Sequence, residues 1–278
     1  MSKIASCWVA IVLAASAAMA DVSLVEHQAV LGKAATGSGK EKPNQARPRM
    51  PTKVTGAITL IDASGLEYFL NTDITFSTSS SASGAASEAS YTGPVSATTS
   101  GVGTVSATLN DAFDGYNALC VSTTGDTGPC STGDPDFTVY NDNGAATLDA
   151  ACSNRQVILP VQTIGTLNVQ RKVFVPSNDE FARWLNTVTN TGGAAQTVTL
   201  VTSNNLGSDT ATVIVSSSDG DATAELTDTW VSTFENYVAT ISDDPRLGHV
   251  LRNAGGAVGL ASNNFVNGND NPFWGYTF

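Results

Sequence analysis

The feature that most limits the fold of this chain is a period-two alternation of side chains, repeated along the sequence in short segments. In residues 196–203, Val198 and Leu200 fall on one face of an extended chain, and Thr197 and Thr199 fall on the other. Long stretches with apolar residues at helical spacing are missing, and Gly, Asn and Asp turn signals separate the alternating segments. The pattern predicts an all-β chain with few or no helices.

Ten segments have the composition and length of strands. Their spacing and turn chemistry favour an antiparallel β-sandwich, large enough to resemble a supersandwich. Residues 77–110 are rich in Ser, Thr, Ala and Gly, and we expect a long surface loop, a weak β excursion or a stack of short strands there. The ten segments are residues 54–61, 66–76, 137–140, 156–163, 166–175, 182–190, 196–203, 211–217, 229–235 and 273–278.

The N-terminus has the three parts of a secretory signal peptide. Lys3 supplies the positive charge, residues 7–18 are mostly apolar, and the run ends in small residues at Ala18 and Ala20. The apolar run is shorter than the about 20 residues that cross a bilayer. We therefore predict a cleaved signal over residues 1–20 and an exported protein, extracellular or at the cell surface, with periplasm or outer membrane as alternatives.

Charge divides the remaining chain into a basic arm and an acidic body. Residues 21–53 hold six basic and three acidic residues and three prolines, which predicts a solvated linker or an extended lead-in. Contact with an anionic surface is a second interpretation of the arm. Residues 54–278 form the predicted sandwich domain and hold six basic and 22 acidic residues. This acidic body disfavours nucleic-acid binding, which needs clustered Lys and Arg, and is compatible with divalent cations.

One short motif carries a family resemblance. The stretch Val188–Gly192 reads Val-Thr-Asn-Thr-Gly and is followed by a returning alternation at residues 197–200. Asn190 and Gly192 suit a turn because both tolerate positive φ. The motif resembles bacterial immunoglobulin-like modules and the opening of galactose-mutarotase-like sandwiches, and the wider chain resembles exported bacterial β-sandwich proteins of unassigned function. The resemblance implies a surface-exposed β-sandwich and carries no catalytic residues with it.

Three cysteines follow the predicted signal peptide, and an exported chain meets oxidising conditions. Cys120 and Cys130 flank a turn-rich stretch that can close a short loop, so we prefer this pair and expect Cys152 to be unpaired. Pairing of Cys152 with Cys120 or with Cys130 stays open, because sequence does not fix connectivity.

No catalytic residue is nominated. The nucleophile motif G-x-S-x-G, the zinc motif H-E-x-x-H and the phosphate loop G-x-x-x-x-G-K-[ST] do not occur in the chain. The sequence has two histidines, His27 in the arm and His249 in the body, and we expect His249 to be an ordinary residue of the sandwich. A glycosidase needs two carboxylates in one cleft, but 22 acidic residues in the body would give such a pair by chance.

Calcium is the ligand that the loops favour most. Hard cations take several oxygen ligands from Asp, Asn and main-chain carbonyls on loops. The leading candidates are Asp219 with Asp221, and Asp111 with Asp114 and Asn117. Residues 141–144 and 267–271 are weaker candidates. Because the same residue types also form ordinary turns, no loop is singled out by its composition.

Aromatic residues suggest two further sites. Trp184, Trp230 and Tyr237 could stack on a sugar, although their places in or beside predicted strands favour core packing. Trp274 and Tyr276 share one face of the last strand with the terminal Phe278, an arrangement that resembles the closing strand of outer-membrane β-barrels.

We therefore predict a secreted or cell-surface β-sandwich protein without catalysis and with a structural, adhesive or carbohydrate-binding role. Its partner would be a carbohydrate, a surface protein or another copy of itself. One alternative is a carbohydrate-active enzyme or its accessory domain on a supersandwich. The other is an outer-membrane β-barrel.

Overall fold

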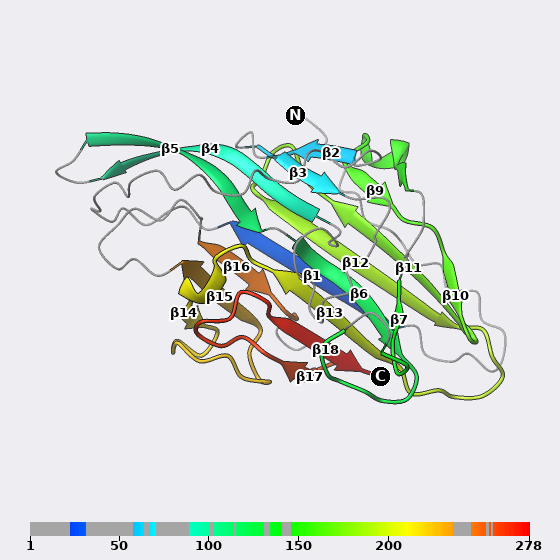
Figure 1. Cartoon of the computed structure of the whole chain (residues 1–278). Coiled ribbons are helices and arrows are strands. Elements are labelled where there is room, and N and C mark those ends of the chain that lie inside the picture. Colours follow the sequence, from blue (N-terminus) through cyan, green and yellow to red (C-terminus); the bar gives the residue numbers. More distant parts are fainter. Residues whose placement is uncertain are drawn as a thin grey trace.

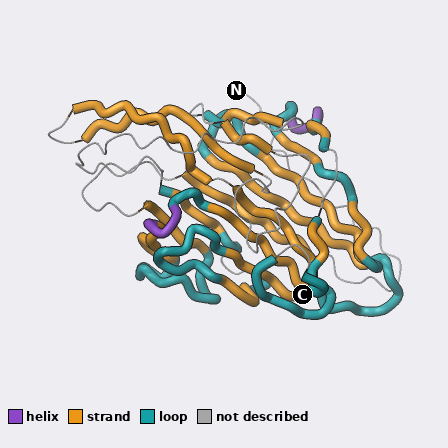
Figure 2. The backbone as a smooth tube through the Cα atoms, viewed as in Figure 1, coloured by secondary structure: helices purple, strands orange, loops and turns teal. Residues whose placement is uncertain are grey.

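The structure is all-β, as the alternating sequence predicts (Figures 1 and 2). Within the described ranges, the chain forms 18 strands and two single-turn 3₁₀ helices, Ala150–Cys152 and Asp209–Ala211. No helix in this part of the chain is long and apolar enough to cross a membrane. This computed structural model describes residues 23–31, 58–63, 67–70, 89–99, 103–113, 115–130, 134–140, 146–235, 246–253, 256 and 258–278.

The largest layer is an antiparallel sheet of nine strands. Their order is β14-β15-β16-β1-β12-β11-β9-β8, with β10 also paired to β11. The strands are β1 (Ser23–Leu31), β8 (Thr147–Leu148), β9 (Gln156–Ile158), β10 (Gln162–Ile164), β11 (Leu167–Phe174), β12 (Phe181–Asn190), β14 (Thr212–Ser217), β15 (Trp230–Glu235) and β16 (Leu247–Val250).

Two smaller antiparallel sheets complete the fold. The five-stranded sheet has the order β17-β18-β13-β6-β7, and the four-stranded sheet has the order β2-β3-β4-β5. The first contains β6 (Gly115–Ser122), β7 (Thr138–Val139), β13 (Thr199–Asn205), β17 (Leu260–Asn263) and β18 (Phe273–Thr277). The second contains β2 (Ile58–Ile61), β3 (Glu67–Leu70), β4 (Ala89–Thr99) and β5 (Gly103–Phe113).

The alternation in the sequence becomes a buried face and an outer face. Every second residue is buried along β11, beginning with Leu167, and along β12 from Ala182 to Val188. One continuous apolar cluster joins all three sheets, with Tyr68 from β3, Trp184 from β12 and Trp274 from β18. The three sheets therefore share one core, which makes the architecture an antiparallel β-sandwich.

Two aromatic residues of the C-terminal strand, Trp274 and Tyr276, point into this core. Trp274 and Tyr276 are almost completely buried, and Phe278 packs against the same apolar cluster. The expectation that the three share one face fits this arrangement. That face is an inner face of the sandwich.

The N-terminal arm begins with a strand that the sequence analysis missed. Residues 23–31, which we expected to belong to the linker, form β1 between β12 and β16 in the nine-stranded sheet. The stretch contains no proline or glycine and includes the β-branched Val25 and Val30, whereas the prolines of the arm all lie between residues 43 and 51. For these nine residues, an extended lead-in describes the structure better than a solvated linker.

The Ser/Thr-rich segment follows the β-excursion expectation over part of its length. β4 and β5 pair along most of their length, from Thr99 and Gly103 at the turn to Tyr91 and Phe113 at the base. Figure 1 shows this hairpin reaching beyond the body of the sandwich. Residues 77–88 lie outside the described residues.

Candidate functional site

A disulfide closes the loop that follows β6. Cys120, within β6, is bonded to Cys130, and their Cα atoms are 5.8 Å apart. This is the pair that the sequence analysis preferred. The expectation of an unpaired Cys152 is wrong, because Cys152 is also disulfide-bonded and the described chain has no free cysteine.

The disulfide-closed loop covers the outer face of the five-stranded sheet. All residues of β6 and β13 are buried, so both faces of these strands are shielded from solvent. On the outer face, Cys120 and Cys130 form a small buried cluster with Val201 of β13, and Phe137 packs against it. The loop is thus fixed by its disulfide and by an apolar contact beneath it.

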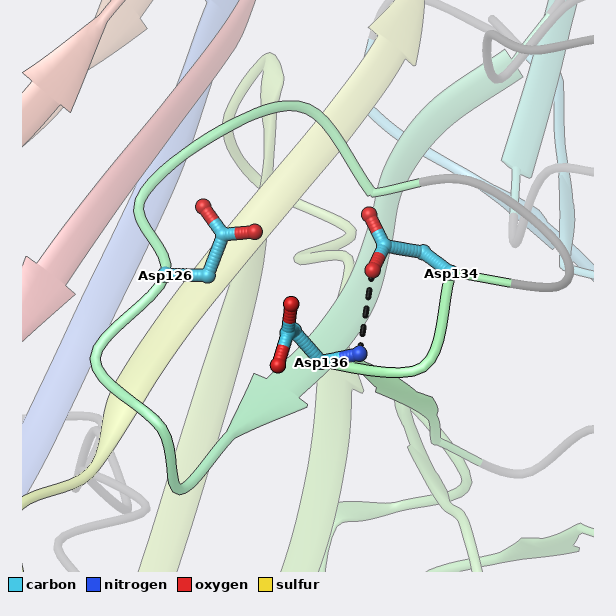
Figure 3. A group of neighbouring side chains, drawn as sticks. All are labelled: Asp126, Asp134 and Asp136. Atoms are coloured by element: carbon cyan, nitrogen blue, oxygen red, sulfur yellow. Dashed lines mark hydrogen bonds between the residues drawn. The ribbon is translucent and has the colours of Figure 1, made fainter.

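Three carboxylates converge at this loop (Figure 3). Asp126 lies between the two bonded cysteines, and Asp134 and Asp136 lie just before β7. One oxygen from each side chain lies within 4.8 Å of one from each of the others. Figure 3 shows Asp126 facing the other two across the space between the two loop segments.

Local hydrogen bonds orient two of these side chains. The Gly128 N–H donates to Asp126 Oδ1 at 2.8 Å, and the Asp136 N–H donates to Asp134 Oδ1 at 3.0 Å. Asp126 and Asp134 are half-buried, and Asp136 is exposed. Like charges this close repel one another, and a bound cation relieves that repulsion. Three carboxylate oxygens beside solvent form the donor set that Ca²⁺ prefers, with water or main-chain carbonyls filling the remaining positions.

The sequence analysis missed this group because its members do not form a local motif. Asp126 is eight residues from Asp134, and the two lie on opposite sides of Cys130 in the sequence. Its only signals in the sequence are the acidic residues on either side of Cys130.

The predicted site at Asp219 and Asp221 lies in the loop between β14 and β15. Ser217 Oγ is 2.6 Å from Asp219 Oδ1 and 3.1 Å from Asp221 Oδ1, and the Thr223 N–H donates to Asp221 Oδ1 at 2.7 Å. The hydrogen bond from Ser217 lowers the pKa of Asp219, with a further contribution from main-chain N–H groups. Donors of the loop itself thus bind these carboxylates, and the described residues bring no third acid within ligand distance of both.

The second predicted site is not a loop. Asp111 lies within β5, Asn117 lies within β6, and Asp114 is outside the described residues. The main-chain and side-chain oxygens of Asn117 both accept hydrogen bonds from the guanidinium of the buried Arg171. Asn117 is therefore bound to a cation of the protein itself.

The structure places two of the three residues of the predicted aromatic platform. Trp184 is fully buried, and its ring centroid lies 4.8 Å from that of Tyr116. Trp230 is 38% exposed on β15, and Tyr237 lies outside the described residues. For Trp184 the structure supports the core-packing interpretation.

His249 is buried in the sandwich, as expected for an ordinary residue of the fold. Its Nδ1 lies 2.8 Å from the Tyr116 hydroxyl and its Nε2 lies 2.8 Å from the Thr233 hydroxyl. Burial lowers the pKa of His249 to about 3 and raises the pKa of Tyr116 well above its usual range. A neutral imidazole with both nitrogens bonded inside the core is poorly placed to act as a general base on a substrate.

Comparisons with known proteins give no match: no family model fits the chain, and no curated protein or solved structure resembles it significantly. The resemblance proposed for Val188–Gly192 stays a prediction. In the structure this segment spans the end of β12 and a turn in which Asn190 Oδ1 accepts from the Gly192 N–H at 2.9 Å. The chain then crosses to β13 in the five-stranded sheet.

Proposed function

We propose that this chain is an exported, non-catalytic β-sandwich protein with a structural or ligand-binding role at the cell surface, and that its disulfide-closed loop binds Ca²⁺. The observation that carries the proposal is the convergence of Asp126, Asp134 and Asp136 within 4.8 Å, on a loop fixed by Cys120–Cys130.

Ca²⁺ bound at this position has a structural role, because it connects two segments of the loop. Asp126 belongs to the segment inside the disulfide, whereas Asp134 and Asp136 belong to the segment that leads into β7. An ion held by all three ties the two segments together over the outer face of β6. A site that is partly exposed and has three charged ligands resembles extracellular calcium modules, which bind in the range of about 10⁻⁴ to 10⁻³ M.

The buried residues also support a role outside catalysis. His249 is the histidine of the sandwich body, and its hydrogen bonds to Tyr116 and Thr233 hold it in the core. Arg171 is likewise directed into the core, where it bonds to Asn117. These side chains connect the two large sheets, which is a structural use of groups that often carry chemistry.

Thermal unfolding of the exported protein tests the proposal. With about 5 mM CaCl₂ we expect the melting temperature to rise by a few degrees relative to a chelator, from about 1 kcal/mol of binding free energy. The double variant Asp134→Asn, Asp136→Asn should lose this shift. The matched control, Asp219→Asn with Asp221→Asn, removes the same charge from another loop and should keep it.

Equal calcium shifts in the natural protein and in the Asp134→Asn, Asp136→Asn variant would overturn the calcium site. Isothermal titration with CaCl₂ gives the same distinction without heating. For the wider role, steady turnover of a glycan, lipid or peptide by the purified protein would contradict a non-catalytic function.

A further inference from the structure

β1 occupies the interior of the nine-stranded sheet. Ser23 to Val30 pair with Val188 to Phe181 of β12, and Gln28 to Leu31 pair with Val250 to Leu247 of β16. Both pairings are antiparallel, so β1 bonds along both of its edges. Without β1, the facing edges of β12 and β16 would present unpaired N–H and C=O groups in the middle of the sheet.

No short connection determines which copy of the chain supplies this strand. The next described strand along the chain is β2, which begins at Ile58, so 26 residues separate it from Leu31 at the end of β1. A connection of this length can span up to about 90 Å when extended. The partners β12 and β16 are far from β1 in sequence, so a tight turn does not impose the pairing.

Charge also favours an approach between copies. The connection at residues 32–57 holds six basic residues and one acidic residue, whereas residues 54–278 have a net charge of −16. A basic segment of one copy is therefore attracted to the acidic body of another, most strongly at low ionic strength.

We propose that β1 is exchanged between copies of this chain, so that the space between β12 and β16 of one molecule receives β1 of a second molecule. An identical β1 restores the same register and the same hydrogen bonds, as in strand exchange and domain swapping. The attached β1 has a local concentration in the millimolar range, so dilute molecules close on themselves and exchange requires folding at high concentration. Once formed, an exchanged strand is held along both edges and is released slowly.

Two variants, each with one added cysteine, test the exchange. The register places Leu24 opposite Thr187. Leu24→Cys and Thr187→Cys chains are mixed in equal amounts, unfolded with their disulfides reduced, and refolded together in a glutathione redox buffer. Refolding is carried out at about 1 µM, far below the effective concentration of the tether, and at about 1 mM, which is comparable to it. Non-reducing electrophoresis and mass spectrometry of the linked peptides then identify disulfides between residues 24 and 187.

The matched control pairs Leu24→Cys with Thr163→Cys, an exposed position on β10, which pairs with β11 and not with β1. We expect the 24–187 dimer to exceed the control dimer several-fold at high concentration and to match it at low concentration. The double variant carrying both Leu24→Cys and Thr187→Cys shows whether β1 has the expected register, because it should form the disulfide within one chain when refolded dilute.

Yields of the 24–187 dimer equal to the control at both concentrations, with the disulfide forming within single chains of the double variant, would show that β1 serves only its own molecule. Absence of the disulfide in every sample would overturn the register itself. Either result is independent of calcium binding, because the residues involved lie outside the disulfide-closed loop.

Discussion

The Tyr116 hydroxyl lies 2.8 Å from Nδ1 of His249, and this contact joins the two large sheets inside the core. Tyr116 belongs to β6 of the five-stranded sheet, and His249 belongs to β16 of the nine-stranded sheet. The Thr233 hydroxyl of β15 forms a hydrogen bond with the other ring nitrogen, Nε2. The imidazole is therefore bonded on both sides by hydroxyl groups that suit its neutral form.

This burial predicts a loss of stability in weak acid. The pKa of His249 is lowered to about 3 in the folded protein, whereas an unfolded histidine titrates near about 6.5. The unfolded state therefore binds more protons between these values, and the free energy of unfolding falls as pH drops below about 6.5, by up to about 1.4 kcal/mol per pH unit. Denaturant unfolding at pH 7, 6 and 5 measures this slope.

His249→Gln is the matched variant for that measurement, since it removes the titrating group and leaves other acids and His27 in place. It should be less stable at pH 7 and should lose part of the pH dependence between about 6.5 and 5. Identical slopes in both proteins would show that His249 is not the cause.

Gly275 is predicted to tolerate no side chain. A Cβ at this position would lie 2.8 Å from Ser262 Oγ and 3.1 Å from Val201 Cγ2, between strands that flank β18. Gly275→Ala should lower the free energy of unfolding by about 1–3 kcal/mol through overpacking. Gly193→Ala is the control, because its Cβ would meet nothing within 4 Å. Comparable unfolding midpoints for the two variants would contradict the close packing.

Arg171 is predicted to be irreplaceable even by lysine. Its guanidinium donates to the main-chain and side-chain oxygens of Asn117 and to Oδ1 of Asn186, and thereby links β6 to β11 and β12. A lysine ammonium lacks the planar set of donors that serves these acceptors together. Arg171→Lys should cost about 2–4 kcal/mol, measured by urea unfolding, because buried oxygens lose their donors. Lys172→Arg, at the neighbouring half-buried position, should change stability little, and an equal loss there would argue against a specific role for Arg171.

The disulfide is predicted to support both the fold and the proposed calcium site. Replacing Cys120 and Cys130 with alanine should lower stability by about 2–4 kcal/mol, because the unfolded chain gains freedom. The same change should weaken calcium binding, since Asp126 is then no longer held opposite Asp134 and Asp136. Calorimetric titration with CaCl₂ checks this point, and unchanged affinity in the folded variant would show that the loop does not need its disulfide.

The strands that sequence alone predicts are those with alternating side chains. Expected segments 166–175 and 182–190 correspond closely to β11 and β12, because one face of each is buried in the core. β4 consists largely of Ser, Thr, Ala and Gly and has no apolar alternation to reveal it, and β16 has only four residues. Short or small-residue strands depend on pairing with distant partners, which local sequence does not show.

The disulfide, the buried arginine and the carboxylate group also differ in how far the local sequence predicts them. The disulfide was predictable because Cys120 and Cys130 flank a turn-rich stretch that can close on itself. The burial of Arg171 was not predictable, because charged residues are rarely buried without partners. Its acceptor Asn117 belongs to another sheet, and local sequence does not show that contact. The carboxylate group depends likewise on two loop segments meeting, which only the folded chain brings about.

The position of β1 has a consequence for the timing of folding. Its two neighbours in the sheet end at Asn190 and Val250, so the centre of the largest sheet is completed only after nearly the whole chain has been synthesised. At about 5–20 residues per second, the ribosome needs roughly 10–45 s to proceed from Leu31 to Val250. During that interval the nascent chain lacks the strand β16 that pairs with the second edge of β1, so the main layer is completed late in synthesis.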